Sequence, residues 1–145
     1  MGASKYFSKE EQVRIVSAIQ SAEKNTSGEI RVHIDIRCKE DVLDRAAWLF
    51  HKLKMDNTAL RNGVLIYLAV ESKTFAVIGD AGINNIVPEN FWEDTKEKMS
   101  AKFKENALLD GILTGISEAG QKLKDFFPFE QDDINELSDE ISFEK

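Results

Sequence analysis

The sequence is poor in the residues that stabilise many small secreted or zinc-dependent domains. It contains a single cysteine, Cys38, so no disulfide can form within the chain, and we expect a reducing compartment. The only two histidines, His33 and His51, have no Cys or His partner at the spacing of a zinc site. The sequence therefore excludes a disulfide-bonded scaffold and predicts no zinc centre.

Long apolar stretches are missing as well. The longest apolar run, residues 64–70, is too short to cross a bilayer, and the first residues, MGASKYFSKEEQ, lack the apolar segment of a secretory signal. We therefore expect a cytoplasmic protein with no membrane partner. A Gly-rich phosphate loop is also absent, since the stretch GDAGI matches neither G-x-x-x-x-G-K-[ST] nor G-x-G-x-x-G, and the sequence contains no G-x-S-x-G nucleophile elbow.

Acidic residues exceed basic ones only at the C-terminal end. From Asp125 onward there are eight acids and one base, which accounts for the whole formal charge of −7. The preceding residues hold 18 acids and 18 bases and are neutral. An acidic end on a neutral body argues against nucleic acid as a partner. We expect one folded domain over residues 1–128 and an acidic tail over residues 129–145.

The spacing of apolar residues predicts four helices and three strands. Ser8 and Glu11 form a capping box for the first helix, and Asp41 can cap the second. In EIRVHIDI the apolar residues alternate strictly, which predicts a strand with one face in the core and the other partly wet. The expected elements are a helix that ends near residue 25, strand 29–36, helix 42–53, strands 63–70 and 74–79, a helix that starts at Pro88, and helix 108–126.

This order of elements is typical of a three-layer α/β/α sandwich, a Rossmann-like mixed sheet with helices on both faces. A right-handed crossover should make the first two strands parallel, and the short connection ESK should make the third antiparallel to the second. Gly111, Gly115 and Gly120 weaken the last helix, so we expect its backbone to approach the sheet closely there. Trp48 and Trp92 are expected in the core.

The run KTFAVIGDAG places a carboxylate, Asp80, between two glycines at the end of a strand. With two parallel strands and a third that runs backwards, the starts of the first two and the end of the third share one edge of the sheet. Glu29, Asn62 and Asp80 should meet there, and their carboxylate and amide oxygens suit Ca²⁺ or Mg²⁺. We predict a divalent-cation site with these three ligands. It would be lined by Arg61, Gly63, Gly79, Ala81 and Gly82, with Gly79 and Gly82 permitting a positive φ and a close approach to the ion.

Simpler interpretations of these residues stay open. Glu29 can pair with Arg61 or merely begin a strand, and a Gly-Asp turn is common. His33 is expected to be solvated or lightly packed beside Asp35 rather than to act as a general base. Cys38 lies between two basic residues, which favours the thiolate, but no candidate base accompanies it.

Four blocks of the sequence resemble, in order, those of the TPM domain. They read TSGEIRVHI, RNGVLIYLAV, FAVIGDAGI and FKENALLDGILTGI, and they are specific in combination. The resemblance covers roughly residues 8–126, and the tail DDINELSDEISF is similar to that of small cytosolic bacterial members. The family includes thylakoid-lumen proteins tied to photosystem II repair and many bacterial proteins of unknown role.

The resemblance implies an α/β/α sandwich, the binding of divalent cations, notably calcium, and the phosphatase label carried by plant representatives. Carried over block by block, the acid of GEI falls on Glu29, the NG pair on Asn62 and Gly63, and the acidic loop on residues 80–82. The chain departs from many relatives in two ways. We expect neither their signal peptide nor their membrane anchor, and G-D-A-G stands where they have an aromatic glycine loop, which would alter the site.

Three functions are therefore considered. The first is a domain that binds Ca²⁺ or Mg²⁺ and has an unknown physiological role. The second is a weak metal-dependent phosphatase in which Arg61 assists, although its catalytic residues are unknown because no nucleophile or base stands out. The third is an interaction module, in which the acidic tail docks on an unidentified protein partner or on the body through Ile134, Leu137, Ile141 and Phe143.

Overall fold

The structure, a computed structural model, describes residues 2–129 and 136–144. The elements, in chain order, are η1 (Gly2–Tyr6), α1 (Lys9–Glu23), β1 (Glu29–Asp35), α2 (Val42–Lys52), β2 (Gly63–Ala69), β3 (Thr74–Gly79), α3 (Ala81–Asn84), α4 (Glu93–Lys104), α5 (Leu108–Leu123) and β4 (Ser142–Phe143). The strands form one sheet in the order β3-β2-β1-β4. In this sheet β1 runs parallel to β2 and β4, and β2 runs antiparallel to β3.

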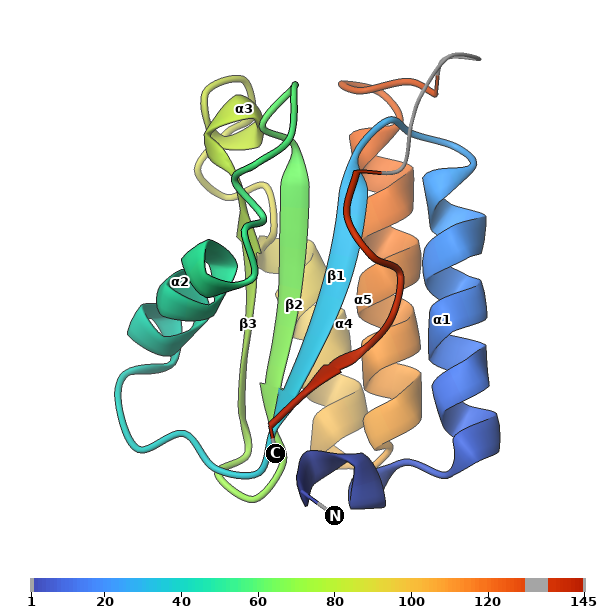
Figure 1. The fold of residues 1–145 in the computed structure, drawn as a ribbon, viewed down its shortest axis with the longest axis vertical. Coiled ribbons are helices and arrows are strands. Elements are labelled where there is room, and N and C mark those ends of the chain that lie inside the picture. The colour runs from blue at the N-terminus through green and yellow to red at the C-terminus, as the bar shows by residue number, and fades with distance from the viewer. Residues whose placement is uncertain (1, 130–135, 145) are drawn as a thin grey trace.

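The predicted three-layer α/β/α sandwich is confirmed. Helices α1, α4 and α5 cover one face of the sheet, and α2 lies on the other (Figure 1). Ser8 and Glu11 close the predicted capping box of α1, and Asp41 accepts hydrogen bonds from the first-turn amides of α2. Within the described residues, no helix combines the length and the apolar character that a membrane span requires.

Alternation along the strands separates two apolar clusters. Ile30 and Val32 of β1 belong to the cluster under α1, α4 and α5. Leu65 and Tyr67 of β2 belong to the cluster under α2. Strand β2 contributes to both clusters and is buried at every residue, as its continuous apolar sequence predicts.

The helix predicted to start at Pro88 begins later. Helix α4 starts at Glu93, and residues 88–92 form turns in which the Phe91 N–H donates to the Pro88 carbonyl at 3.1 Å. Phe91 packs edge to face on Trp92, with ring centroids 4.7 Å apart, and Trp92 is buried as predicted. Aromatic packing therefore holds this segment as a turn, which the spacing of apolar residues did not predict.

The glycines of α5 serve mainly helix–helix packing. A Cβ on Gly111 would lie 2.3 Å from the Phe103 ring of α4, and a Cβ on Gly120 would lie 2.8 Å from Ala22 of α1. Only at Gly115 does the close approach also include a strand, since a Cβ there would meet both α4 and β2. The prediction that all three approach the sheet is therefore wrong for Gly111 and Gly120.

The described part of the acidic tail is docked on β1. Leu137 is buried in the cluster under α2, and the Glu144 N–H donates to the Ile34 carbonyl at 2.9 Å. With the tail in place, every residue of β1 except Arg31 is buried, so the predicted wet face of this strand is wrong. The tail thus docks on the body, one of the two alternatives considered. Ile134 and the rest of 130–135 lie outside the described residues.

Candidate functional site

The three segments predicted to converge do meet at one edge of the sheet. Glu29 is level with Gly63 in the parallel ladder of β1 and β2, and its N–H donates to the Asn62 carbonyl at 3.3 Å. The Asp80 N–H donates to the Gly63 carbonyl at 2.9 Å. The backbone arrangement from which the cation site was predicted is therefore confirmed.

Asp80 has a cationic partner of its own at this edge. The Arg61 guanidinium donates from Nε to Oδ2 and from Nη2 to Oδ1, both at 2.8 Å. Oδ1 also accepts the Ala81 N–H at 2.7 Å, so that Asp80 caps α3. The Asp80 carboxylate is nearly buried, with 6% of the residue exposed, and a two-point Arg–carboxylate pair is among the strongest in proteins. Its negative charge is neutralised without a metal ion.

The glycines beside Asp80 are required for space rather than for a positive φ. Within the described residues, the only glycine with a positive φ is Gly2, so the conformational reason given for Gly79 and Gly82 is wrong. A Cβ on Gly82 would lie 2.2 Å from the Leu60 carbonyl oxygen, because the Gly82 N–H donates to the Arg61 carbonyl at 2.8 Å. The GDAG motif is thus a tight junction between α3 and the loop that precedes β2.

Glu29 faces different partners from Asp80. It is 4% exposed, and its Oε1 accepts the Leu137 N–H from the tail at 2.5 Å. Burial raises the pKa of Glu29 to about 7. Strand β2 separates it from Asp80 by two inter-strand spacings, roughly 10 Å. Met55 and Leu137 pack over the intervening Gly63, at 3.2 and 3.5 Å from where its Cβ would be.

Asn62, the third predicted ligand, is buried and directed elsewhere. It is 1% exposed, and its side-chain Nδ2 lies 3.5 Å from Ser27 Oγ. In the ranges 2–129 and 136–144, no three His, Cys, Asp or Glu side chains lie close enough together to hold one metal ion. Glu29, Asn62 and Asp80 therefore lie at the same end of the sheet, but each side chain has a different protein partner.

A pair of carboxyl groups that the sequence analysis missed lies next to Glu29. Glu23, at the end of α1, accepts the Ile30 N–H at 2.9 Å, and its carboxyl group lies near that of Asp139 in the tail. Burial, and then the neighbouring Asp139 carboxyl group, raise the pKa of Glu23 to about 9. Asp139 Oδ1 is buried and has no hydrogen-bond partner within the described residues. No local motif marks this pair, since its members are 116 positions apart in the sequence.

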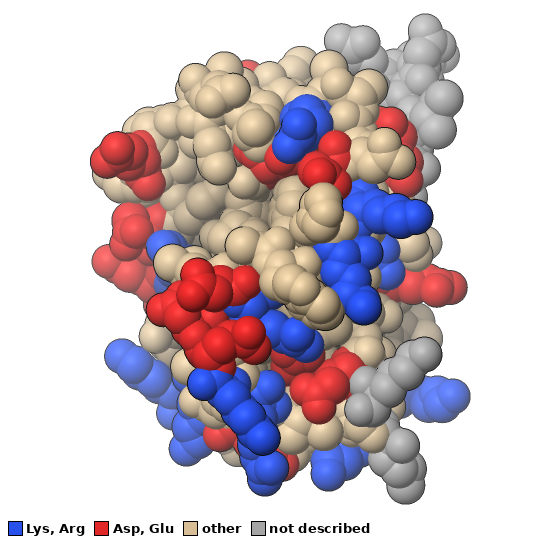
Figure 2. Space-filling view, turned by 60° about the vertical axis from the view of Figure 1, so that its left-hand side comes forward, with Lys and Arg blue, Asp and Glu red and all other residues tan. Residues whose placement is uncertain are grey.

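Two side chains differ in solvent exposure from what the sequence predicted. Trp48, expected in the core, is 52% exposed on α2, with Arg45 and Lys52 each 5.0 Å from its ring centroid. His33, expected to be solvated or lightly packed, is 5% exposed on β1. The face that carries α2 shows acidic and basic side chains interspersed rather than a continuous field of one sign (Figure 2).

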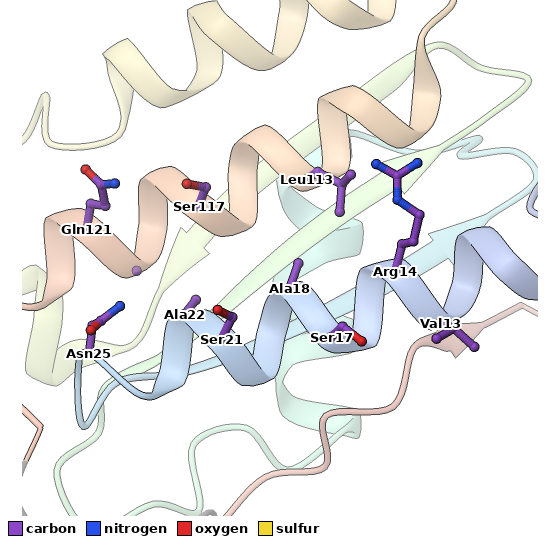
Figure 3. A pocket seen from close by; sticks show the side chains of 11 residues that line it. Val13, Arg14, Ser17, Ala18, Ser21, Ala22, Asn25, Leu113, Ser117 and Gln121 are labelled. Carbon is purple, nitrogen blue, oxygen red and sulfur yellow. The ribbon is translucent and has the colours of Figure 1, made fainter.

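A groove of about 580 Å³ lies on the other side of the molecule, between α1 and α5. Small side chains of α1, among them Ser17, Ala18 and Ser21, line the groove together with Ser117 and Gln121 of α5, and Figure 3 labels them on these two neighbouring helices. The groove has one charged lining residue, and none of the carboxylates described above reaches it. Its chemistry is that of a helix-packing seam, so we place the candidate site at the tail and the start of β1.

Comparison with known proteins then identifies the family. The chain matches the family model of the TPM domain over residues 3–122. The chain belongs to the TPM domain family. The NMR structure of the BA42 protein from the psychrophilic bacterium Bizionia argentinensis is 51% identical, with a TM-score of 0.89 over 94% of each chain. No protein with a curated description matched.

A second solved structure shares the fold of this TPM domain. The N-terminal domain of the cg2496 protein from Corynebacterium glutamicum, also solved by NMR, is 13% identical, with a TM-score of 0.64. The likeness covers 83% of this chain and 76% of that chain. The family match ends at residue 122, so the Glu23–Asp139 pair joins the matched TPM region to the tail beyond it.

Proposed function

We propose that this TPM domain binds a divalent cation, Ca²⁺ or Mg²⁺, between Glu23 and Asp139 at the start of β1. The observation that supports the proposal is the approach of the Asp139 carboxyl group to that of Glu23, in which the buried Asp139 Oδ1 has no hydrogen-bond partner among the described residues. Two carboxyl groups in contact must share a proton or a cation, because two bare carboxylates repel each other. A divalent ion would replace the proton and give Oδ1 a partner.

Two carboxylates are a sufficient protein contribution for such an ion. Mg²⁺ usually keeps several of its waters and is held by one or two carboxylates. The charge of Glu29 raises the pKa of Glu23, so Glu29 would also add to the attraction for a cation. The ligand set predicted from the sequence is less suited to an ion, because Arg61 already neutralises Asp80.

The proposal predicts that cation binding strengthens with pH. The Glu23 carboxyl has a pKa of about 9, so at lower pH an incoming ion must displace a proton. We expect the apparent affinity for Ca²⁺ or Mg²⁺ to rise by roughly tenfold per pH unit between pH 6.5 and 8.5, as one released proton requires. Amide NMR titrations up to about 10 mM, above the weakest affinities usual for calcium modules, would measure this.

Three variants locate the ion. Glu23→Gln and Asp139→Asn should abolish the titration-induced shifts, whereas Asp80→Asn, which changes a carboxylate at the same edge, should preserve them. Loss of binding in Asp80→Asn alone would place the ion at the edge predicted from the sequence. An affinity for wild type that does not change with pH would contradict the proposal. Phosphate-ester turnover in the same samples, if unchanged in Glu23→Gln, would not depend on this ion.

A further inference from the structure

Three polar side chains follow one another along the α2-facing side of β1 and β4. Ser142 Oγ lies 2.8 Å from His33 Nδ1, and His33 Nε2 lies 2.6 Å from Asp35 Oδ1. His33 and Ser142 are level in the parallel ladder, and Asp35 follows two residues later on the same face of β1. Figure 1 shows β4 beside the C-terminal half of β1, where these residues lie. A hydroxyl, an imidazole and a carboxylate are thus connected in the order of a nucleophile, a base and an orienting group.

Asp35 is held as an acceptor. It is fully buried, and it also accepts from Arg45 Nε at 2.8 Å and from the Tyr67 hydroxyl at 2.6 Å. Burial alone would raise its pKa, but the hydrogen bonds from His33, Arg45 and Tyr67 keep that pKa well below its usual range. An ionised Asp35 can only accept, so His33 Nε2 carries a hydrogen, and in the neutral ring Nδ1 is free to accept the Ser142 hydroxyl proton.

The imidazole ring is also fixed in orientation. It stacks on the Tyr67 ring with the two planes 11° apart and centroids separated by 6.0 Å. Tyr67 therefore contacts both the base and the carboxylate that orients it. A ring held by a hydrogen bond at each nitrogen and by stacking has little freedom to leave Ser142.

A donor without a partner lies next to this arrangement. Arg31 Nε is buried and makes no hydrogen bond within the described residues. Arg31 is two residues before His33 on the same face of β1, so that their backbones are roughly 6.6 Å apart. The Arg31 residue as a whole is only partly buried, so its positive charge can stabilise an oxyanion formed on a substrate bonded to Ser142, in competition with the charge of Glu140.

We propose that Ser142, His33 and Arg31 form an acyl-transfer site for small carboxylic esters, with Asp35 as a positioning residue. Ser142 Oγ forms a bond to the ester carbonyl carbon, its proton passes to His33 Nδ1, and the carbonyl π electrons move to the oxygen that faces Arg31. When the carbonyl re-forms, the bond to the alcohol breaks, and the alcohol takes the proton from His33. Water then attacks the acyl-serine in the same way and releases the acid, which restores the Ser142 hydroxyl.

The size of the substrate follows from the burial of the site. His33 is 5% exposed, while Ser142, on the edge strand β4, is partly exposed. An ester can therefore approach only from the edge strand, and its alcohol oxygen takes the proton from His33 beside Ser142 Oγ, which lies 2.8 Å from His33 Nδ1. This access suits a short acyl group such as acetate.

The test uses a fluorophosphonate probe and p-nitrophenyl acetate on the full chain. We expect the probe to label Ser142, as located by mass spectrometry, and labelling and turnover to fall at least 100-fold in Ser142→Ala and His33→Gln, because general base catalysis contributes about 10²–10⁴-fold. Ser138→Ala, a serine of the same segment outside this arrangement, should retain both. Asp35→Asn should lower kcat more than it raises KM, since Asp35 does not touch the substrate.

Three results would overturn the proposal. The first is an unlabelled Ser142 in a chain whose amide spectrum shows the folded state. The second is equal labelling in wild type and His33→Gln, which would mean that these residues only pin the tail to β1. The third is hydrolysis of p-nitrophenyl phosphate without hydrolysis of the acetate, which would assign the site to a different reaction.

Discussion

Gly82→Ala is expected to lower the free energy of unfolding by about 3 kcal/mol, the upper part of the usual range for overpacking. The added methyl group would lie 2.2 Å from the Leu60 carbonyl oxygen and 2.5 Å from that of Arg61. Both contacts are with backbone, which cannot rotate away as the end of a side chain can. Relief would require the loop before β2 to separate from α3, which would also break the Gly82 N–H to Arg61 hydrogen bond.

Gly79→Ala is the matched control for this prediction. The atoms nearest to a methyl group there would all belong to the Ile83 side chain, at 3.3 to 3.4 Å, and a side chain can shift by a few tenths of an ångström. Thermal unfolding should therefore show a decrease of roughly 10 °C for Gly82→Ala and a much smaller one for Gly79→Ala. Equal midpoints for the two variants would mean that the junction relaxes and that GDAG is not held by close backbone contact.

The fold could be predicted because its signals are local. The Ser8–Glu11 capping box, the Asp41 cap and the short hairpin between β2 and β3 each depend on residues within a few positions of one another. The continuous apolar sequence of β2 likewise reports burial on both faces without reference to any other segment. The convergence at one edge of the sheet follows from strand direction alone, so it too could be predicted.

The partners at that edge could not be predicted, because each is chosen over a long distance in the sequence. Asp80 pairs with Arg61 across a loop and a hairpin, and Glu29 accepts the Leu137 amide 108 residues away. The same tail buries His33. The alternation of apolar residues along β1 indicates only that the side chains of His33 and Ile34 lie on opposite faces of the sheet. A pattern gives the face of a strand to which a side chain belongs, but it does not reveal what covers that face.

Glu29→Gln is expected to remove a large part of the pH dependence of stability above pH 4.5. The pKa of Glu29 is raised from its ordinary value of 4.5 to about 7 by burial. The folded protein therefore retains a proton that the unfolded chain releases, and stability falls as pH rises through this window. The difference of about 2.5 pKa units corresponds to about 3 kcal/mol, fully lost above pH 7.

The glutamine variant keeps the acceptor for the Leu137 N–H and has no charge to desolvate. Its free energy of unfolding should match that of wild type near pH 4.5 and exceed it by up to about 3 kcal/mol at pH 8. Denaturant unfolding across this pH range measures the difference, with Glu97→Gln, an exposed position on α4, as the control. If the free energies of unfolding of wild type and Glu29→Gln change equally with pH between 4.5 and 8, the pKa of Glu29 is not raised by folding and the prediction is wrong.

Glu23 and Asp35 also affect how the free energy of unfolding depends on pH. The pKa of Glu23, raised to about 9, extends the loss of stability to higher pH, so Glu23→Gln should add to the gain from Glu29→Gln. Asp35 acts in the opposite direction: its pKa is held below the usual 3.8, so its contribution is present above that value and is lost as pH falls. Wild type should therefore be most stable near about pH 5, where Asp35 is ionised and both glutamates retain their protons in the folded state. A maximum above pH 7 would contradict the protonated state of the two glutamates in the folded protein, and with it the shared proton that a cation is proposed to replace.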